Sequence, residues 1–596
     1  MNKNRPNEDA VQELSDSFPH IDKPELGKID RKDLFFILGL VVCTVFCWIR
    51  CRFGLAVVDE AFFLSLGEKF YHGNAMFVHE WHGAQFTFFL IQPLFAFFHL
   101  FQKSNEGIVL FFRHAYVISQ VLMSLFIYAR TRSFTKAGAG IASLAYLLFC
   151  PLLQSSFNYN SIAILSLHVA LILVITAESR RPLQLMIAGL FFAGAVLCCP
   201  YLLVLYVIYS VVFICKKKWK EWLWFTSSCA LLAVLFFVFL LSRASLSDIL
   251  SNASNVLDDP EHPFTNPLLL IGVYVSLIMD VTPMAGVIFI LIILTAIIIF
   301  LIPKFRKKKD YLLLFSSVLV IGLIIEITAA GARSEVNSYP LNKVMFPINI
   351  LTPVCVLFYN DKTVRKLFSY LWIPGMVYGV CISFISNLGI YSICSASSVA
   401  TTASILIVAI TYTNHFSLKI CGGKLAVVAL TILFICQLGA ESFLRYVSVY
   451  PGHPLSELTV KMDNGCEKGL IVSSNEKNVV EARLEYTSVI RNDPLKQKVA
   501  YITYQFWMAL EDWDVSSCTP SNWLAGLHQY NEDNPNAFVI ERLDLFYSLN
   551  PDRIPDMIFV DAGYDDVEQW YIDKFGYEVL SSDEKNGTIL VRQDTI

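Results

Sequence analysis

The chain has 596 residues, of which 55% are hydrophobic, 14% aromatic and only 16% charged, with a formal net charge of −4. This composition excludes a soluble globular protein of that length, and the negative net charge gives no basis for nucleic-acid binding. The sequence therefore predicts a polytopic α-helical membrane protein.

Three parts follow one another along the chain. Residues 1–33 are a polar tail, residues 34–446 carry repeated apolar runs, and residues 447–596 are again ordinary polar sequence. The tail lacks the charged-then-apolar pattern and the small-residue cleavage site of a signal peptide, so the first apolar run is expected to be an uncleaved first helix. We expect a cytoplasmic tail, a transmembrane domain and an extracytoplasmic domain.

The apolar runs have the length that a spanning helix needs, and they predict about thirteen spans. These lie near 34–51, 108–128, 138–153, 161–177, 184–197, 201–214, 222–241, 284–302, 311–330, 343–359, 368–386, 394–411 and 424–446. The apolar segment 83–101 is left out, because counting it as a span would invert everything that follows. Without it, the first outer loop covers residues 52–107.

The basic residues then fix the orientation. Six loops on one side carry 19 Lys and Arg. The opposing loops at 154–160, around Pro200, and at 242–283, 331–342 and 387–393 contribute only Arg243 and Arg333. The positive-inside rule places the N-terminus in the cytoplasm and the C-terminal domain outside. Arg50 and Arg52 stand at the outer end of the first span, against this rule. Anchoring to lipid phosphates and binding of an anionic head group both remain open for them.

The first outer loop holds an acidic pair, Asp59-Glu60, just beyond the first span. A carboxylate in that position is a functional-site hypothesis, with a solvated loop acid as the plain alternative. Apolar residues at helical spacing between 61 and 70 predict a short amphipathic surface helix directly after the pair.

A second polar cluster in this loop is formed by His79, Glu80 and His82 around Trp81. Its spacing does not match a zinc signature such as H-E-x-x-H, so no metal site is predicted, although a need for a divalent metal stays open. A polar rim around the tryptophan is the alternative to substrate binding.

At this point the chain resembles the polytopic glycosyltransferases of the GT-C fold class, which use polyprenyl-phosphate sugars and include aminoarabinose transferases and protein O-mannosyltransferases. The resemblance is carried by one helix, an outer loop with Asp59-Glu60, surface helices, and Phe111-Phe112-Arg113-His114 at the start of the next span. It implies that Asp59 is the catalytic base, with Glu60 beside it, and that Arg113 matches a recurring arginine. The proline-rich start of the family's surface segment is absent, with only Pro93 inside it.

The chemistry of such a transfer sets further requirements. A carboxylate must take the proton of the acceptor hydroxyl, and the phosphate leaving group needs positive charge or hydrogen-bond donors. Arg333, with Lys343 just beyond, is a candidate for a phosphate clamp, and a surface pair with Glu335 is the alternative. Two adjacent acids should point apart and cannot bracket one bond, which disfavours a glycosidase. The predicted substrate-binding residues are Arg52, Glu80, His82, Arg113, Arg333 and Lys343.

Outside this loop the signals are weaker. Asn158-Tyr159-Asn160 at another outer turn is either a helix cap or a contact to sugar hydroxyls. The C-terminal domain alternates strands and helices, which predicts a small α/β domain with a largely parallel sheet and without a nucleotide-binding loop. Its aromatic cluster is either core or a stacking surface for sugars. Pairing of Cys466 with Cys518 stays open.

The sequence thus predicts a cell-membrane glycosyltransferase of GT-C type, without a cofactor. Its partners would be a polyprenyl-phosphate-linked sugar donor and a glycan, wall polymer, lipid or protein acceptor at the outer face. The alternatives are a flippase or transporter of lipid-linked sugars, for which Glu326 and His168 are the candidate polar residues near helix midpoints, and a non-catalytic envelope assembly protein.

Overall fold

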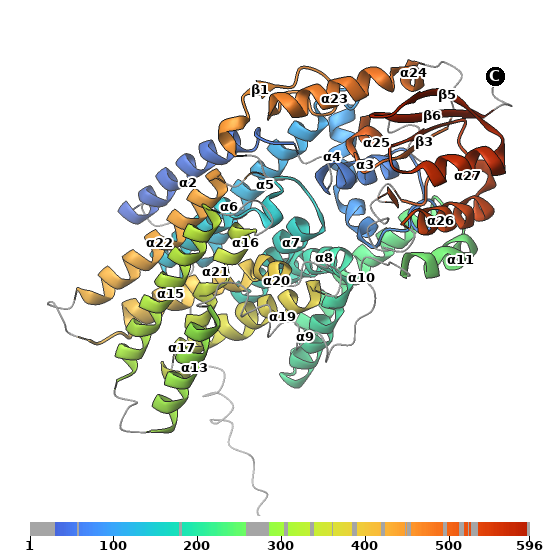
Figure 1. The fold of residues 1–596 in the computed structure, drawn as a ribbon. Coiled ribbons are helices and arrows are strands. Elements are labelled where there is room, and N and C mark those ends of the chain that lie inside the picture. The colour runs from blue at the N-terminus through green and yellow to red at the C-terminus, as the bar shows by residue number, and fades with distance from the viewer. Residues whose placement is uncertain are drawn as a thin grey trace, which may run out of the picture.

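The computed structural model describes residues 30–592 apart from 56–58, 178–181, 258–284, 303–307, 334–338, 360, 384–389, 419–423, 448, 450–453, 493–497, 512–517, 522–523 and 526–534. These residues form a helical body, from α2 to α22, and a C-terminal unit of helices and strands at one end of it (Figure 1). In the described part, eight helices are long and apolar enough to cross a membrane, and three shorter apolar helices accompany them. The chain is therefore a helical membrane protein.

The helical body contains nineteen helices in the described residues. They are α2 (Arg31–Arg50), α3 (Asp59–Tyr71), α4 (Phe88–His99), α5 (Ile108–Thr131), α6 (Lys136–Leu148), α7 (Tyr159–Thr176), α8 (Pro182–Cys198), α9 (Leu203–Cys215), α10 (Trp219–Leu241), α11 (Leu246–Leu257), α13 (Ala285–Leu301), α15 (Lys309–Gly331), α16 (Pro340–Val344), α17 (Leu351–Phe358), α18 (Lys362–Leu367), α19 (Ile373–Ile382), α20 (Ile390–Ala396), α21 (Ser398–Asn414) and α22 (Leu425–Val447).

Side-chain caps fix where several of these helices begin. The Asp30 carboxylate accepts hydrogen bonds from backbone N–H groups at the start of α2, and the Asp33 carboxylate in turn accepts one from the N–H of Asp30. Asn158 and Ser161 form the same reciprocal box at α7, so the cap interpretation of Asn158 is confirmed. The segment predicted not to span contains α4, whose 12 residues reach about 18 Å, short of the roughly 30 Å of a bilayer core.

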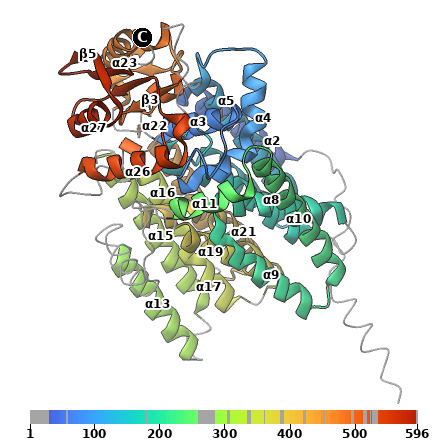
Figure 2. The ribbon, with the colours of Figure 1, turned by 90° about the vertical axis from the view of Figure 1, so that its right-hand side faces the viewer.

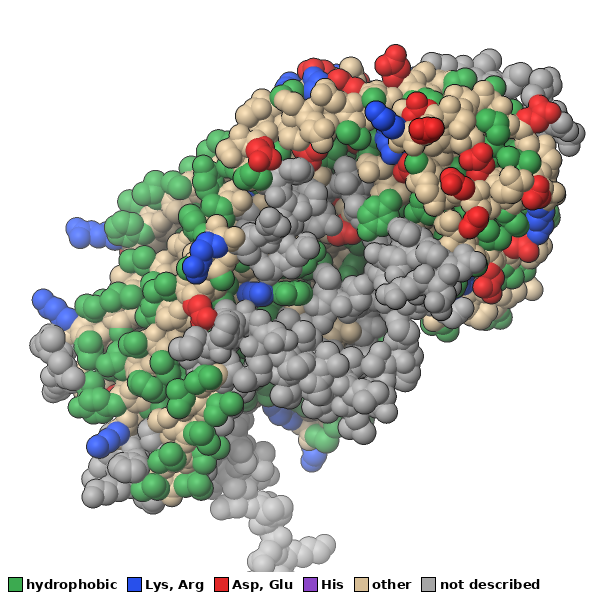
Figure 3. Space-filling view, viewed as in Figure 1, with side chains coloured by type: hydrophobic (Ala, Val, Ile, Leu, Met, Phe, Trp, Pro, Cys, Tyr) green, Lys and Arg blue, Asp and Glu red, His purple; other side chains and the backbone are tan. Residues whose placement is uncertain are grey.

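Charged side chains gather at the two ends of the molecule, as the space-filling view shows. Lys and Arg stand at the tips of the helical body, hydrophobic side chains cover its flanks, and acidic side chains collect over the C-terminal unit (Figure 3). This distribution is the one expected of a body enclosed by lipid with a water-facing unit at one end.

Three arginines hold the C-terminal ends of three helices. Arg50, at the end of α2, donates from Nε to the carbonyl oxygen of Arg445 in α22 at 2.9 Å. Arg445 donates from Nη1 to the carbonyl oxygens of Leu147 and Leu148 at the end of α6, at 2.8 and 2.9 Å. Arg113 of α5 donates to the carbonyl oxygens of Cys51 and Gly54 just beyond α2, both at 2.9 Å.

These contacts explain why arginine stands at this end of the body. Helix C-termini carry unpaired carbonyl groups and negative partial charge, which a buried guanidinium satisfies. Both interpretations of Arg50 from the sequence turned its side chain toward lipid, but the side chain is buried against α22. Of the two arginines that disagreed with the positive-inside rule, Arg50 is therefore a helix cap, whereas Arg52 is exposed.

The helix predicted after the acidic pair is present as α3, but it does not lie on the surface. Every residue from Glu60 to Phe70 is buried. On one side Phe63 lies 6.1 Å from Phe88 of α4, and on another Phe62 lies 5.8 Å from Phe506 of the C-terminal unit, between ring centroids. The surface prediction was wrong because α3 is apolar around most of its circumference, the pattern of an enclosed helix.

The C-terminal unit contains two sheets and five helices in the described residues. The elements are β1 (Val460–Lys461), β2 (Ile471–Val472), α23 (Ser474–Tyr486), α24 (Ser488–Asn492), β3 (Val499–Ile502), α25 (Trp507–Glu511), α26 (Pro535–Leu549), β4 (Met557–Val560), α27 (Asp565–Phe575), β5 (Tyr577–Asp583) and β6 (Gly587–Arg592). β1 and β2 pair antiparallel, and the second sheet has the order β3-β4-β6-β5.

The prediction of a largely parallel sheet was wrong. Only β3 and β4 run parallel, whereas β4-β6 and β5-β6 are antiparallel. The reason is the tight turn after β5, where the Asp583 carboxylate accepts from the backbone N–H groups of Lys585 and Asn586, at 2.9 and 2.8 Å. Gly587 follows with φ +101°. Such a hairpin forces its two strands to be antiparallel.

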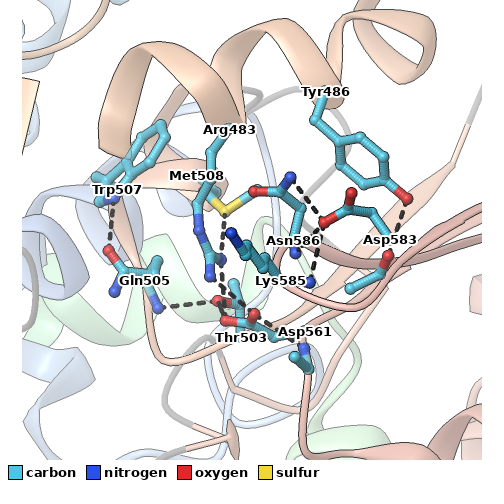
Figure 4. Close-up of polar contacts among 12 residues, drawn as sticks. Arg483, Tyr486, Thr503, Gln505, Trp507, Met508, Asp561, Asp583, Lys585 and Asn586 are labelled. Atoms are coloured by element: carbon cyan, nitrogen blue, oxygen red, sulfur yellow. Dashed lines mark hydrogen bonds and ion pairs between the residues drawn. The ribbon is translucent and has the colours of Figure 1, made fainter. Parts of the chain in front are cut away.

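A polar network ties α23 to the carboxyl ends of the two parallel strands (Figure 4). Arg483 binds both oxygens of Asp561 at 3.0 Å, and the Thr503 hydroxyl donates to the same carboxylate at 2.6 Å. Trp507, from the predicted aromatic cluster, is fully buried and donates to Gln505 at 3.0 Å, which makes it core. Cys466 and Cys518 are both buried and are not joined to each other.

The C-terminal unit is fastened to the first outer loop by backbone and side-chain bonds. Ile471 of β2 exchanges bonds with the chain beyond α2, donating to the Arg52 oxygen at 2.8 Å and accepting from Gly54 at 2.9 Å. Trp81 N donates to the Pro520 oxygen at 2.7 Å, and Lys69 Nζ donates to the Thr519 oxygen at 3.0 Å. Figures 1 and 2 accordingly place the unit beside α3.

One buried acid at this junction predicts a dependence of stability on pH. Glu467 is fully buried, and neither of its oxygens has a hydrogen-bond partner among the described residues. Burial, and after it the nearby Glu511, raises the pKa of Glu467 from 4.5 to about 8. The unfolded chain loses this proton at lower pH than the folded protein, so stability falls as pH rises from 4.5 to about 8 and then levels off.

We expect Glu467→Gln to remove this fall, leaving the variant more stable than the wild type at pH 8.5 by up to roughly 5 kcal/mol. The measurement is the melting temperature of the purified protein between pH 5 and pH 8.5. Glu584→Gln, at an exposed acid of the hairpin, is the matched control and should follow the wild type. Parallel curves for the wild type and Glu467→Gln would contradict the assignment.

Candidate active site

Asp59 is the first residue of α3, where its side chain is half-buried and held by one amide. Gln154 Nε2 donates to Asp59 Oδ2 at 2.7 Å, and Gln154 Oε1 in turn accepts from Asn158 Nδ2 at 2.8 Å. Because Asn158 also caps α7, the amide is fixed at both ends. The structure therefore sets the orientation of the Asp59 carboxylate through a side chain from a different loop.

Backbone strain is concentrated around this carboxylate. Of five described residues other than glycine with positive φ, three lie here: Leu152 at 55°, Leu153 at 61° and Tyr339 at 37°. Leu152 N donates to Asn342 Oδ1 at 3.0 Å, which joins the two strained segments. Such conformations cost about 1–3 kcal/mol each and persist where the surroundings impose them, often at functional sites.

Tyr339 and Lys343 bring a phenol and a cation to the same region. Burial, and after it the negative charge of Asp59, raises the pKa of Tyr339 to about 12. The rings of Tyr339 and Tyr391 lie 5.6 Å apart, and Lys343 Nζ stands 5.1 Å from the centre of the Tyr391 ring. Lys343, a substrate-binding candidate from the sequence, is thus linked to Tyr339 through the ring of Tyr391.

Glu60 has a different environment from its neighbour. Its carboxylate binds Arg113, with Nε at 2.9 Å from Oε1 and Nη2 at 2.5 Å from Oε2, and both side chains are buried. The same guanidinium caps the end of α2 through Cys51 and Gly54. The pair therefore locks α3 to α2 and α5, and it leaves Asp59 as the acid with access to the site.

A small cavity of about 20 Å³, about the room for one water molecule, lies next to this pair. Gln154 and Glu60 line it together with Arg50, Arg113 and Arg445. Arg445 is buried, and its Nε has no hydrogen-bond partner among the described residues. Three guanidinium groups against one carboxylate give the cavity an excess of positive charge.

The other predicted binding residues do not converge on Asp59. Glu80 is fully buried and bound to Lys69 Nζ at 3.0 Å, in the core between α3 and the C-terminal unit. His82 caps the turn at Gly83–Thr87. Arg52 and Arg333 are exposed, and Arg333 donates to its own helix at Ala329. Glu335 lies outside the described residues.

The histidine beside Glu80 is neutral. Burial, with Arg553 and Lys69 adding to it, lowers the pKa of His79 to about 3. Its Nδ1 accepts the backbone N–H of Ala75 at 2.9 Å. Two members of the polar cluster, His79 and Glu80, thus take part in buried or partly buried hydrogen bonds.

Gln154, Tyr339 and Arg445 were not singled out from the sequence, and Arg50 was considered only for contact with lipid phosphates or an anionic head group. Gln154 lies in an ordinary-looking turn, and Arg445 is separated from Arg50 by 395 residues. No local pattern marks a residue whose role depends on partners so distant. The left-handed backbone of Leu152 and Leu153 is likewise invisible in their residue type, which disfavours it.

Comparisons with protein-family models, with curated proteins and with solved structures find no match to this chain. The fold defines the class as a helical membrane protein in which α3 lies between helices of the body and a C-terminal unit.

The Glu60–Arg113 pair gives a stability prediction. Arg113→Met leaves a buried carboxylate without its partner, so we expect a loss of about 3–5 kcal/mol in unfolding free energy. The double variant Arg113→Met with Glu60→Leu removes both charges and should recover most of the loss. The thermal stability of the detergent-solubilised protein measures this. A double variant no better than the single one would show that the pair is not the cause.

Proposed function

We propose that the protein is a membrane glycosyltransferase of GT-C type, which moves a sugar from a polyprenyl-phosphate carrier to an acceptor at the outer face of the cell membrane. In this proposal the chain crosses the membrane about thirteen times, with its N-terminus in the cytoplasm and its C-terminal unit outside. The acceptor is a cell-surface glycan, wall polymer, lipid or protein, and no organic cofactor takes part.

The observation that carries the proposal is the setting of Asp59. It is a half-buried carboxylate held by Gln154, and Gln154 also lines the cationic cavity. A carboxylate so placed can take the proton of an acceptor hydroxyl as that oxygen attacks the anomeric carbon. The bond from the anomeric carbon to the phosphate oxygen then breaks, and the carrier phosphate leaves with the electron pair.

The leaving phosphate needs positive charge rather than a proton, and the site offers it from two directions. Arg50, Arg113 and Arg445 surround the cavity on one side of Gln154, and Lys343 lies beyond Tyr339 on the other. Guanidinium and ammonium groups of this kind are the usual partners of phosphate oxygens. Arg113 is already saturated by Glu60 and two carbonyl groups, so Lys343 and Arg445, whose Nε has no hydrogen-bond partner among the described residues, are the better candidates for this role.

A transport function receives less support from the described residues. A carrier-lipid flippase needs polar groups along a path near helix midpoints. His168, one of the two candidates, is fully buried, with Nδ1 at 2.8 Å from the Ile164 oxygen and Nε2 at 3.0 Å from the Thr402 hydroxyl. Both ring nitrogens are thus engaged inside the packed helices, which favours a structural role.

The test is sugar transfer by membranes that contain wild type or Asp59→Asn, supplied with a labelled polyprenyl-phosphate sugar pool and native envelope acceptors. Asn keeps the shape but cannot accept the proton, so we expect transfer to fall by about 10²–10⁴-fold at equal expression. Asp565→Asn, at an exposed acid of the C-terminal unit, is the matched control. Undiminished transfer by Asp59→Asn would refute the base, and carrier translocation without transfer by the wild type would favour a flippase.

Gln154 offers a graded version of the same test. Gln154→Ala removes the amide that orients Asp59, and the loss of one hydrogen bond to a charged group should lower transfer about tenfold. Because Asp59 itself remains, the residual transfer rate should still fall at low pH, where the carboxylate base becomes protonated. A loss as large as that of Asp59→Asn would instead point to a direct role of Gln154 in binding the substrate.

A further inference from the structure

A second constellation of polar side chains lies at the far end of α3. Glu68 lies on the last turn of this helix, His72 is the first residue beyond it, and His99 is the last residue of α4. One carboxylate oxygen and one nitrogen from each ring all lie within 4.8 Å of one another. Glu68 is fully buried, whereas the His72 side chain keeps 22% of its surface exposed.

The hydrogen bonds of His99 assign its proton. Its Nδ1 lies 3.0 Å from the backbone carbonyl oxygen of Gln102, and a carbonyl can only accept, so Nδ1 carries a hydrogen. Nε2 of a neutral ring is then a lone pair, yet it faces Glu68 Oε1 at 2.9 Å. Two acceptors at that distance need a positive charge between them, either a proton or a metal ion.

The pattern is that of a metal-binding histidine, whose second ring nitrogen is held by a backbone carbonyl. The carboxylate divides its oxygens between the rings, with Oε1 toward His99 and Oε2 at 3.1 Å from His72 Nε2. Around a tetrahedral ion with bonds of about 2.0–2.2 Å, neighbouring ligand atoms stand roughly 3.3–3.6 Å apart. The two nitrogen–oxygen distances are slightly shorter than this, and one ligand atom from each of the three side chains lies within 4.8 Å of the others.

Tyr71 fixes the two rings. It stacks on His99, with ring centroids 4.9 Å apart and planes at 16°, and it meets His72 edge-on at 4.8 Å. The ligands are therefore presented by two helices and one packing residue. The exposed part of His72 gives the ion a path from solvent.

We propose that Glu68, His72 and His99 form a site for a divalent transition metal, and we assign Zn²⁺ as its ion. Two imidazole nitrogens and one carboxylate oxygen suit zinc, whereas Mg²⁺ and Ca²⁺ prefer oxygen ligands alone. Three protein ligands leave one coordination position to water. The ion would clamp the end of α3 to the end of α4.

This site is separate from Asp59. Nine residues along the helix place Glu68 about 14 Å from Asp59, so the ion does not touch the candidate base. The sequence predicts no metal site but leaves a need for a divalent metal open, and the proposed site does not depend on the proposed transfer reaction. Its test accordingly needs no activity measurement.

The experiment uses the full-length protein, purified in detergent and stripped with a chelator. Co²⁺ is added as a spectroscopic probe, since its visible absorption reports nitrogen and oxygen ligands, and Zn²⁺ is then titrated against it. We expect one Co²⁺ per chain, its displacement by Zn²⁺, and a loss of affinity of at least about 100-fold in His72→Ala and in His99→Ala. Mg²⁺ should displace nothing.

The matched control is His415→Ala. His415 is also half-exposed and lies 2.7 Å from a carboxylate, that of Asp361, but it belongs to no described cluster of three ligands. It should bind Zn²⁺ as the wild type does. If His99→Ala does not fold, as circular dichroism would show, the partly exposed His72 decides the result. Equal Zn²⁺ affinity of the wild type and His72→Ala would overturn the site and leave Glu68 paired with imidazolium rings alone.

Discussion

The structure depends on a chain of buried arginines at one end of the helical body. Each guanidinium leaves one helix and caps the carbonyl groups of another, from α5 to α2, from α2 to α22 and from α22 to α6. A buried charge is costly unless fully bonded, so the three contacts are strong only together. They fix the positions of four helices relative to one another along their axes, and the loop that follows α2 begins at this end of the body.

The segment that follows α2 uses these arginine contacts to position the candidate site. Glu60 binds the arginine that caps α2, which fixes the first turn of α3 and places Asp59 at its edge. The C-terminal unit then covers α3 from the other side, through Lys69 and Trp81. A loop enclosed in this way can hold strained backbone and an acid whose amide partner, Gln154, lines a cationic cavity.

The sequence predicted the membrane class, the helix after the acidic pair and the cap at Asn158, because each depends on local composition or spacing. It did not predict the arginine caps, since Arg50 and Arg445 meet across 395 residues. The burial of α3 and the mixed sheet were mispredicted for related reasons. A covering domain and a strand order are tertiary facts, and apolar periodicity alone does not distinguish an enclosed helix from one lying on a surface. Asp59 was chosen from its position, whereas Gln154, which orients it, carries no signal of its own.

The covering of α3 also has a consequence for how the protein is made. Lys69 and the Thr519 carbonyl oxygen that it binds are 450 residues apart. At about 5–20 residues per second, the ribosome needs roughly 20–90 s to pass from one to the other. Throughout that interval the side of α3 that packs against the C-terminal unit, with Phe62 and Lys69, lacks its partners. A later part of the chain thus completes the packing of a much earlier one, so this side of α3 must be shielded in some other way until the C-terminal unit has been made.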